Sequence, residues 1–206
     1  MVRTSSIPAV LLAAGRSSRM GEPKATLTLP GGDTFIGRIT KELVAGGAAP
    51  VIAVVSGREE PHAAPVTIAG PPTVQYVINP EPDRGQTSSL QCGLAPVREA
   101  EAVLVTLVDV PLVTAGVVRA LIQAWKRSGA CVVRPTQAGR HGHPILIAQP
   151  VIRELLAADP SAPARSIIRR HAAGGVELEV AEDGPFLDVD TPEEYQRLIA
   201  SLTVDR

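Results

Sequence analysis

The sequence has few aromatic residues and few cysteines, and each shortage excludes a class of protein. Only 2% of the 206 residues are aromatic, which leaves the core to Val, Leu, Ile and Ala, as is typical of buried parallel strands covered by helices. Two cysteines, Cys92 and Cys131, are too few for a disulfide framework, and neither belongs to a metal-binding Cys/His cluster. We expect small buried thiols in a reducing compartment.

The chain also lacks an excess of charge and a long apolar run. With 20 Lys and Arg against 21 Asp and Glu, the net charge is -1, which argues against a general binder of nucleic acid or anionic membranes. No run approaches the roughly 18 apolar residues of a membrane span. Residues 7–14 after Arg3 resemble a signal peptide, but Arg16, Arg19 and Lys24 follow where an export signal has small neutral residues. We predict a cytoplasmic protein.

Apolar runs alternate with amphipathic segments along most of the chain. The patterns predict strands at 8–14, 50–57, 73–79, 102–111 and 130–135. They predict helices at 34–46, 87–97, 114–129 and 191–202. Residues 136–148 and 172–188 interrupt the alternation and indicate hairpin or edge structure. We therefore predict a three-layer α/β/α fold with a mostly parallel sheet, formed by one domain over residues 1–206.

The segment GRSSRMGEPK, residues 15–24, is the most informative loop. Gly15 and Gly21 allow sharp turns that expose backbone amides, and Arg16, Arg19 and Lys24 add positive charge. This combination suits a triphosphate or pyrophosphate. The spacing matches neither the P-loop nor the dinucleotide-binding glycine pattern, and a solvated basic loop is the alternative.

Two acidic positions are candidates for a metal site. Asp109 follows a very apolar strand, where one carboxylate oxygen suits Mg²⁺, although it also suits a cap for the next helix. Asp188 and Asp190 are two residues apart, so in an extended segment we expect both to point the same way and one of them to reach the metal. The alternative is again a helix start, at Asp190-Thr191-Pro192.

Hydroxyl groups gather at the start of the predicted helix 87–97. Gly85, Thr87, Ser88 and Ser89 lie where a helix N-terminus would bind a base, ribose or phosphate. A plain capping cluster explains the hydroxyls equally well.

Two histidines alternate in the glycine-rich segment 139–147. His141 and His143 have the spacing of metal ligands, but the segment provides no third ligand for zinc. We interpret His143 as a hydrogen-bonding contact to a substrate.

Taken together, these motifs resemble those of a known family. The segment LLAAGRSSRMGEPK is similar to the signature loop of the molybdenum cofactor nucleotidyltransferases (MobA-like NTP transferases), and most similar to their cytidylyltransferase branch. Further motifs follow in the family's order over residues 11–194: Asn79 with Gly85-x-x-Ser88-Ser89-Leu90, Asp109-Val110-Pro111, Gly142-His143-Pro144 and Asp188-x-Asp190-Thr191-Pro192-Glu193.

The resemblance implies a Rossmann-like nucleotidyltransferase fold and a Mg²⁺-dependent enzyme. The reaction would transfer CMP from CTP to the phosphate of molybdopterin and release pyrophosphate. The implied nucleotide-binding residues are Leu12, Ala13, Ala14, Gly15, Arg16, Ser17, Ser18, Arg19, Lys24, Asn79, Gly85, Ser88 and Ser89.

The resemblance also implies the remaining roles. Arg19, Lys24 and Asp109 would be catalytic, and Asp109 with Asp190 would hold Mg²⁺. The substrate contacts would be His143 and Arg165, and a molybdenum hydroxylase or its accessory proteins would be partners.

Several residues distinguish the branches of the family or depart from its pattern. Ala14 and Pro23 favour CTP, because the guanylyltransferase branch has Gly at the position of Ala14 and tends to have Asp at the position of Pro23. Val110 stands where Gln is common, and Gln86-Thr87 replaces a Met-Ser-type pair. Segment 159–168, which should face the acceptor, matches the family loosely.

Three other functions stay open at this point. A sugar- or alditol-phosphate nucleotidyltransferase has a similar opening loop. A non-catalytic accessory protein would bind the finished molybdenum cofactor, and a regulator would only bind nucleotide. Lys24 and Asp109 are both present, which argues against a catalytically dead site.

Overall fold

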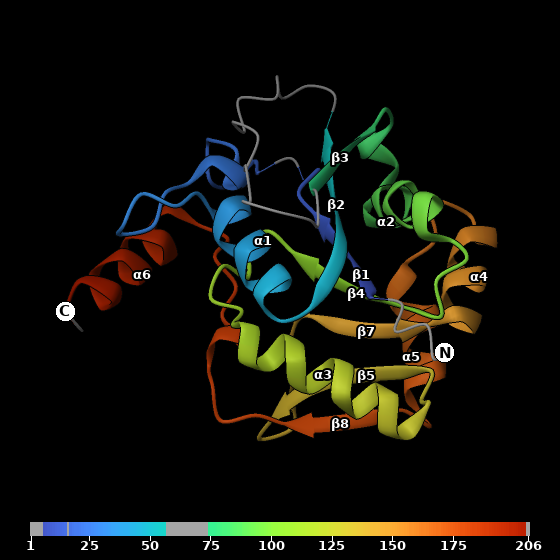
Figure 1. Ribbon diagram of the computed structural model, residues 1–206. Coiled ribbons are helices and arrows are strands. Elements are labelled where there is room, and N and C mark those ends of the chain that lie inside the picture. Colours follow the sequence, from blue (N-terminus) through green and yellow to red (C-terminus); the bar gives the residue numbers. More distant parts are fainter. Residues whose placement is uncertain (1–5, 16, 57–73, 205–206) are drawn as a thin grey trace.

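The computed structural model describes residues 6–15, 17–56 and 74–204. An eight-stranded sheet lies between two layers of helices (Figure 1). Its strands are β1 (Ile7–Leu12), β2 (Ala48–Ser56), β3 (Val74–Asn79), β4 (Ala102–Leu107), β5 (Val132–Gln137), β6 (Arg140–His141), β7 (Ile145–Ala148) and β8 (Val176–Glu179).

Six α-helices are present in the described part of the chain, none of them long and apolar enough to cross a membrane. They are α1 (Phe35–Ala45), α2 (Gln86–Leu94), α3 (Ala115–Ser128), α4 (Gln149–Ala157), α5 (Ala164–Ala172) and α6 (Pro192–Val204). Short 3₁₀ turns occupy Lys24–Thr26, Pro82–Arg84, Ala95–Val97 and Gly184–Phe186.

One half of the sheet is entirely parallel. Its strands lie in the order β3-β2-β1-β4, and Leu12 at the end of β1 pairs with Val54 on one side and Leu107 on the other. Parallel strands end at the same edge of a sheet. The loops after β1 and β4 therefore start side by side, where open α/β sheets bind their ligands.

The other half of the sheet is mixed. Strand β7 lies between β4 and β5 and is antiparallel to both, while β8 pairs parallel to β5. In this register Ile145, the first residue of β7, is opposite Val105 of β4. The start of β7 consequently lies at the edge where β4 ends.

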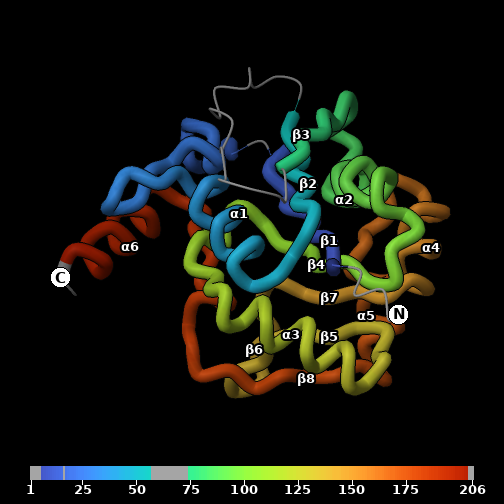
Figure 2. The backbone as a smooth tube through the Cα atoms, viewed as in Figure 1, coloured from blue at the N-terminus to red at the C-terminus, as the bar shows by residue number. Residues whose placement is uncertain are grey.

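Alternation of side chains along β1 divides the core into two layers. Ala9 and Leu11 pack on the face covered by α1 and α3, while Val10 and Leu12 pack on the face covered by α2, α4 and α5 (Figure 2). Such aliphatic packing on both faces is typical of a central parallel strand. Cys92 and Cys131 are half-buried free thiols.

The predicted α/β/α architecture with a mostly parallel sheet is confirmed. The predicted strand 102–111 is too long, because β4 ends at Leu107 and a turn follows. Segment 136–148 does contain a hairpin, between β5 and β6, but β7 is an internal strand rather than edge structure. Helices α4 and α5 were not predicted.

Candidate functional site

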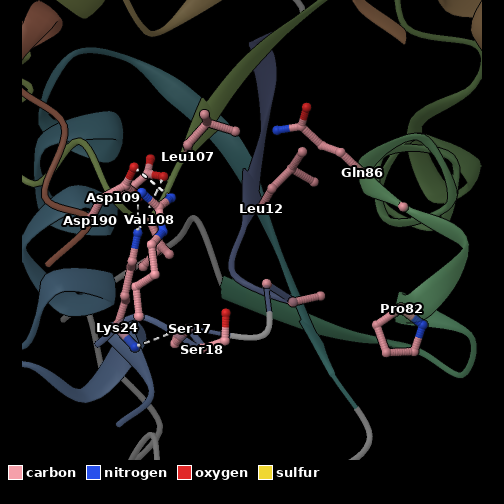
Figure 3. Close-up of a pocket in the computed structure, with 14 residues that line it drawn as sticks. Leu12, Ser17, Ser18, Lys24, Pro82, Gln86, Leu107, Val108, Asp109 and Asp190 are labelled. Carbon is pink, nitrogen blue, oxygen red and sulfur yellow. Dashed lines mark hydrogen bonds and ion pairs between the residues drawn. The ribbon is translucent and has the colours of Figure 1, made fainter. Parts of the chain in front are cut away.

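A cavity of 330 Å³ opens at the carboxyl ends of β1 and β4 (Figure 3). Lys24, Asp109 and Asp190 gather on one side of this first cavity, and Pro82 and Gln86 face them from the other. The full lining is Leu12, Ala14, Gly15, Ser17, Ser18, Arg19, Lys24, Pro82, Gly85, Gln86, Leu107, Val108, Asp109 and Asp190.

A nearly buried ammonium group lies between two carboxylates at the centre of the site. The Lys24 Nζ atom is 2.5 Å from Asp190 Oδ1 and 3.7 Å from Asp109 Oδ2. Arg19 Nη2 donates to the other oxygen of Asp190 at 2.9 Å. The Lys24 side chain is only 11% exposed, whereas that of Arg19 is 68% exposed. Lys24 is therefore enclosed by the site, whereas Arg19 pairs with Asp190 at its solvent-exposed edge.

The loop after β1 places Lys24 by its own hydrogen bonds. Ala13 N donates to Val54 O at 2.8 Å and so continues the ladder past the end of β1. The Ser17 hydroxyl accepts from Lys24 N at 3.2 Å. Gly21 has φ +80°, in the left-handed region that glycine adopts most easily. The backbone thereby turns back and directs the lysine over the ends of the strands.

The two carboxylates are held by the segments in which they lie. Val189 N donates to Asp109 O at 2.8 Å, which ties the segment before α6 to the turn after β4. The Glu194 carboxylate accepts from Asp190 N and Thr191 N at 2.7 and 2.9 Å, as in a capping box. Glu194 thus completes the start of α6 and leaves the Asp190 side chain to Lys24.

Asp109 is not a helix cap. Helix α3 begins at Ala115, and its cap is Thr114, whose hydroxyl accepts from Val117 N at 3.3 Å. The Asp109 carboxylate instead faces Lys24, and its buried Oδ1 atom has no hydrogen-bond partner among residues 6–15, 17–56 and 74–204.

The two carboxylates have opposite pKa shifts. Burial raises the pKa of Asp109, and the neighbouring charge of Asp190 raises it further, against the attraction of Lys24. The pKa of Asp190 is lowered, first by the hydrogen bond from Lys24 and also by Arg19. Asp190 is therefore the firm counter-ion of the lysine, and Asp109 is a buried carboxylate whose charge is poorly compensated.

The Asp109–Asp190 pair fits a divalent metal that also binds phosphate. The buried Asp109 Oδ1 atom offers an oxygen that no described residue uses. Within the described ranges, no three Asp, Glu, His or Cys side chains gather to hold a metal ion. Mg²⁺ is commonly held by one or two carboxylates with its other ligands from phosphates and water, and this donor set matches that pattern.

Asp188 and Asp190 line different cavities. Asp188 lines a separate groove with Leu112 and Phe186, whereas Asp190 lines the first cavity. The Asp188 carboxylate nevertheless lies close enough to Asp109, Asp190 and Lys24 to interact with their charges, so which of the two carboxylates would reach a metal stays a prediction. Burial and the nearby charges of Asp109 and Asp190 raise the pKa of Asp188.

Most of the predicted residues of the loop after β1 line the cavity together, but others do not. Ala13 packs into the core on the opposite face of the sheet, and Arg16 lies outside the described residues. Asn79 donates from its amide to the hydroxyls of both Ser88 and Ser89 at 2.9 Å. These three side chains are buried and do not line the cavity.

The Asn79–serine cluster instead shapes the turn before α2. Asn79 Oδ1 accepts from Glu81 N at 2.9 Å, and the Ser88 hydroxyl donates to Gly85 O at 2.8 Å. Gly85 has φ +107°, which favours glycine, and it does line the cavity. The motif therefore acts on the cavity through the shape of segment 79–86.

A second cavity of 480 Å³ adjoins the first. The two share Leu12, Gln86 and Leu107 as a common wall. The predicted substrate contacts His143 and Arg165 both line this second cavity. Its charged and polar rim is completed by Arg134, His141 and Arg169.

The rim of the second cavity is mainly basic. Arg134 and His141 share the carboxylate of Glu177, at 2.6 and 3.0 Å. Arg165 and Arg169 are exposed on α5, and among the described residues neither makes an ion pair. Burial lowers the pKa of His143, whose Nδ1 atom has no hydrogen-bond partner in the described part of the chain. The second cavity therefore presents net positive charge beside a neutral imidazole.

The sequence motifs did not predict every residue that lines the two cavities. Pro82, Gln86, Leu107 and Val108 border the first cavity without a distinctive chemical signal of their own. Arg134 had a signal, since it interrupts the apolar run of residues 130–135.

The site combines a basic loop after β1 with paired carboxylates at the same edge of an open α/β sheet. These are the features expected of the class of nucleotidyltransferases. The model of the MobA-like NTP transferase domain matches residues 9–175. The chain belongs to this family, as the sequence motifs predicted.

Individual relatives agree with this assignment. The chain is 31% identical to the molybdenum cofactor guanylyltransferase of Rhizobium meliloti, over 95% of this chain and 91% of the relative. It is 26% identical to the molybdenum cofactor cytidylyltransferase of Escherichia coli, over 93% and 94%. Among solved structures, a homologue from Mycobacterium sp. strain JC1 of the Mycobacterium tuberculosis protein Rv0371c matches with a TM-score of 0.76 and 26% identity. That match covers 97% of this chain and 98% of the other.

Proposed function

We propose that the protein is a Mg²⁺-dependent transferase that moves CMP from CTP to the phosphate of a molybdopterin-type acceptor and releases pyrophosphate. One observation carries the proposal: the cavity with the Asp109–Lys24–Asp190 cluster shares a wall with a second, basic cavity. A nucleotide in the first cavity and an anionic acceptor in the second would meet at that wall. The names of the relatives supply the identity of the acceptor.

The chain's own residues would act mainly by position and charge. The attacking group is already an anionic phosphate, so no strong general base is needed. Lys24 is held in place and would contact the triphosphate, and exposed Arg19 would close over it. Asp109 and Asp190 would hold Mg²⁺, which supplies charge stabilisation for the leaving pyrophosphate. Catalysis would then consist of aligning two anions that otherwise repel each other and neutralising developing charge.

The choice of CTP rests on Ala14. Its side chain is buried and lines the first cavity, so its methyl group takes up space that a glycine would leave open. A narrower cavity favours the smaller pyrimidine ring over guanine. This supports the cytidylyl reaction as the first to be tested.

The experiment is a pyrophosphate-release assay with Mg²⁺ and each of the four NTPs in turn. Release that needs both CTP and a molybdopterin acceptor supports the proposal, and release with GTP moves the assignment to guanylyl transfer. Release with a sugar phosphate and no pterin would contradict it. Tight nucleotide binding without any release would point to an accessory protein.

A further inference from the structure

Helix α2 borders both cavities. It also makes hydrogen bonds to the start of α5, the helix that carries Arg165 and Arg169. Gly85 and Gln86 at the N-terminus of α2 line the first cavity, and Gln86 and Leu90 line the second. Figure 3 shows Gln86 extending from α2 towards Leu12 and Leu107. The next residue, Thr87, lines neither cavity and is 3% exposed.

The Thr87 hydroxyl makes two hydrogen bonds to the start of α5. It donates to Ala162 O and accepts from Ala164 N at 2.9 Å. Ala164 is the first residue of α5, where a backbone N–H has no partner within the helix. Pro163, the residue before the helix, makes no side-chain cap. A threonine of another helix, 77 positions away in the sequence, therefore satisfies the first amide of α5.

The first turn and a half of α5 forms one side of the second cavity. Ala164, Arg165, Ile168 and Arg169 all line it, and the two arginines are one turn apart on the same face of the helix. The position of α5 thus determines where the cationic side chains of the acceptor cavity lie relative to Gln86 and the first cavity.

We propose that Thr87 is a positioning residue: its hydroxyl fixes the first turn of α5 against α2 and so sets the distance between the acceptor-side arginines and the nucleotide cavity. The kinetic effect expected of Thr87 rests on the proposed function, whereas the hydrogen bonds that anchor the start of α5 do not depend on it. Serine keeps the hydroxyl, whereas valine has nearly the same shape and lacks it.

Gln91 provides a matched control on the same helix. Its amide donates to Leu155 O and Ala158 O at 2.8 and 2.9 Å, so it also ties α2 to the connection between α4 and α5. It contacts the end of α4 rather than the start of α5, and it lines neither cavity. Gln91→Leu removes a similar number of hydrogen bonds without releasing the first turn of α5.

The experiment compares Thr87→Val, Thr87→Ser and Gln91→Leu in the full chain. For Thr87→Val we expect a rise of roughly tenfold in KM for the acceptor, since a buried amide loses its partner, with KM for CTP within about twofold of the wild-type value. Thr87→Ser and Gln91→Leu should keep the wild-type acceptor KM. Thr87→Ala replaces Thr87→Val if the valine variant does not fold.

Amide hydrogen exchange gives a readout that does not depend on activity. Exchange over residues 162–169 should be faster in Thr87→Val and at the wild-type rate in Gln91→Leu and Thr87→Ser. Wild-type exchange and acceptor KM in Thr87→Val would overturn the inference, as would equal effects of Thr87→Val and Gln91→Leu. A wild-type protein without transferase activity would refute the proposed function, and the exchange data alone would then decide the role of Thr87.

Discussion

The two cavities balance their charges in different ways. In the first, the cations Lys24 and Arg19 are paired with Asp109 and Asp190. In the second, Glu177 offsets Arg134 and His141, while Arg165 and Arg169 face the cavity on α5 without a carboxylate partner among the described residues. The second cavity can therefore attract an anion unaided, whereas in the first the two cations and the two carboxylates cancel, and the proposed metal ion would supply the net positive charge.

The strongest test of this contrast is Asp109→Asn. It removes one of the two carboxylates proposed to hold the metal at nearly constant shape, so we expect turnover to fall on the order of a thousandfold, because a catalytic metal supplies several kcal/mol of charge stabilisation. Pyrophosphate release measures the loss, and circular dichroism checks the fold. Asp188→Asn, in the neighbouring groove, should retain most of the activity; turnover near the wild-type level in Asp109→Asn would refute the metal assignment.

On the acceptor side, Arg169→Gln removes one of the unpaired cations. We expect KM for the acceptor to rise roughly tenfold at low ionic strength and KM for CTP to stay constant, because the arginine lines only the second cavity. Added salt should shrink the difference, since exposed charges are screened within about 10 Å at 0.1 M. Arg127→Gln, an arginine in the last turn of α3, is the control, and an equal effect from it would remove the basis for the comparison.

A smaller change is expected from Ala14→Gly. The loss of one methyl group from the first cavity should shift the CTP-to-GTP ratio of kcat/KM by about fourfold towards GTP, since a buried methyl or methylene group accounts for about 0.8 kcal/mol. Competition assays with both nucleotides measure the ratio. If Ala14→Gly leaves it unchanged, the base is selected elsewhere in the cavity.

The smallest expected effect is on Tm, which substitutions of Asp109 and Asp190 should shift in opposite directions. Burial raises the pKa of Asp109, so its ionised form opposes folding at neutral pH, and Asp109→Asn should raise Tm by about 2 °C. The pKa of Asp190 is lowered by Lys24, so Asp190→Asn should lower Tm by a similar amount. Both differences should fade as the pH falls below 3.8, the ordinary value for Asp. Tm shifts of the same sign at pH 7 would contradict this assignment.

The parallel half of the molecule was predictable because its signals are local. Each predicted strand is a mainly apolar run bounded by a glycine, a proline or an acidic residue, and the loop with Lys24 follows its strand directly. Asp109 was found for the same reason, by its place after the most apolar strand. The pairing of Asp190 rather than Asp188 with Lys24 was not decidable, since it depends on how Glu194 closes the start of α6.

The mixed half of the sheet was harder to predict, because its elements follow one another without a clear boundary or combine residues that lie far apart in the sequence. The segment ILIAQPVIRELL, 145–156, contains all of β7 and most of α4 with no residue between them, so no loop signal separates the strand from the helix. Helix α5 buries only Ala164 and Ile167, and five of its nine residues are charged or polar. The second cavity combines residues from α2, β5, β7 and α5, so no single segment of the sequence indicates it.

The reversed direction of β7 has a consequence for engineering. Because β7 runs against β4, its first residue, Ile145, pairs with Val105 near the end of β4, and His143 lies just before it in the chain. The single stretch of chain from Arg134 to Arg169 contributes most of the second cavity and none of the first. A graft of this segment from a relative with a different acceptor should transplant acceptor choice and leave nucleotide choice with the host.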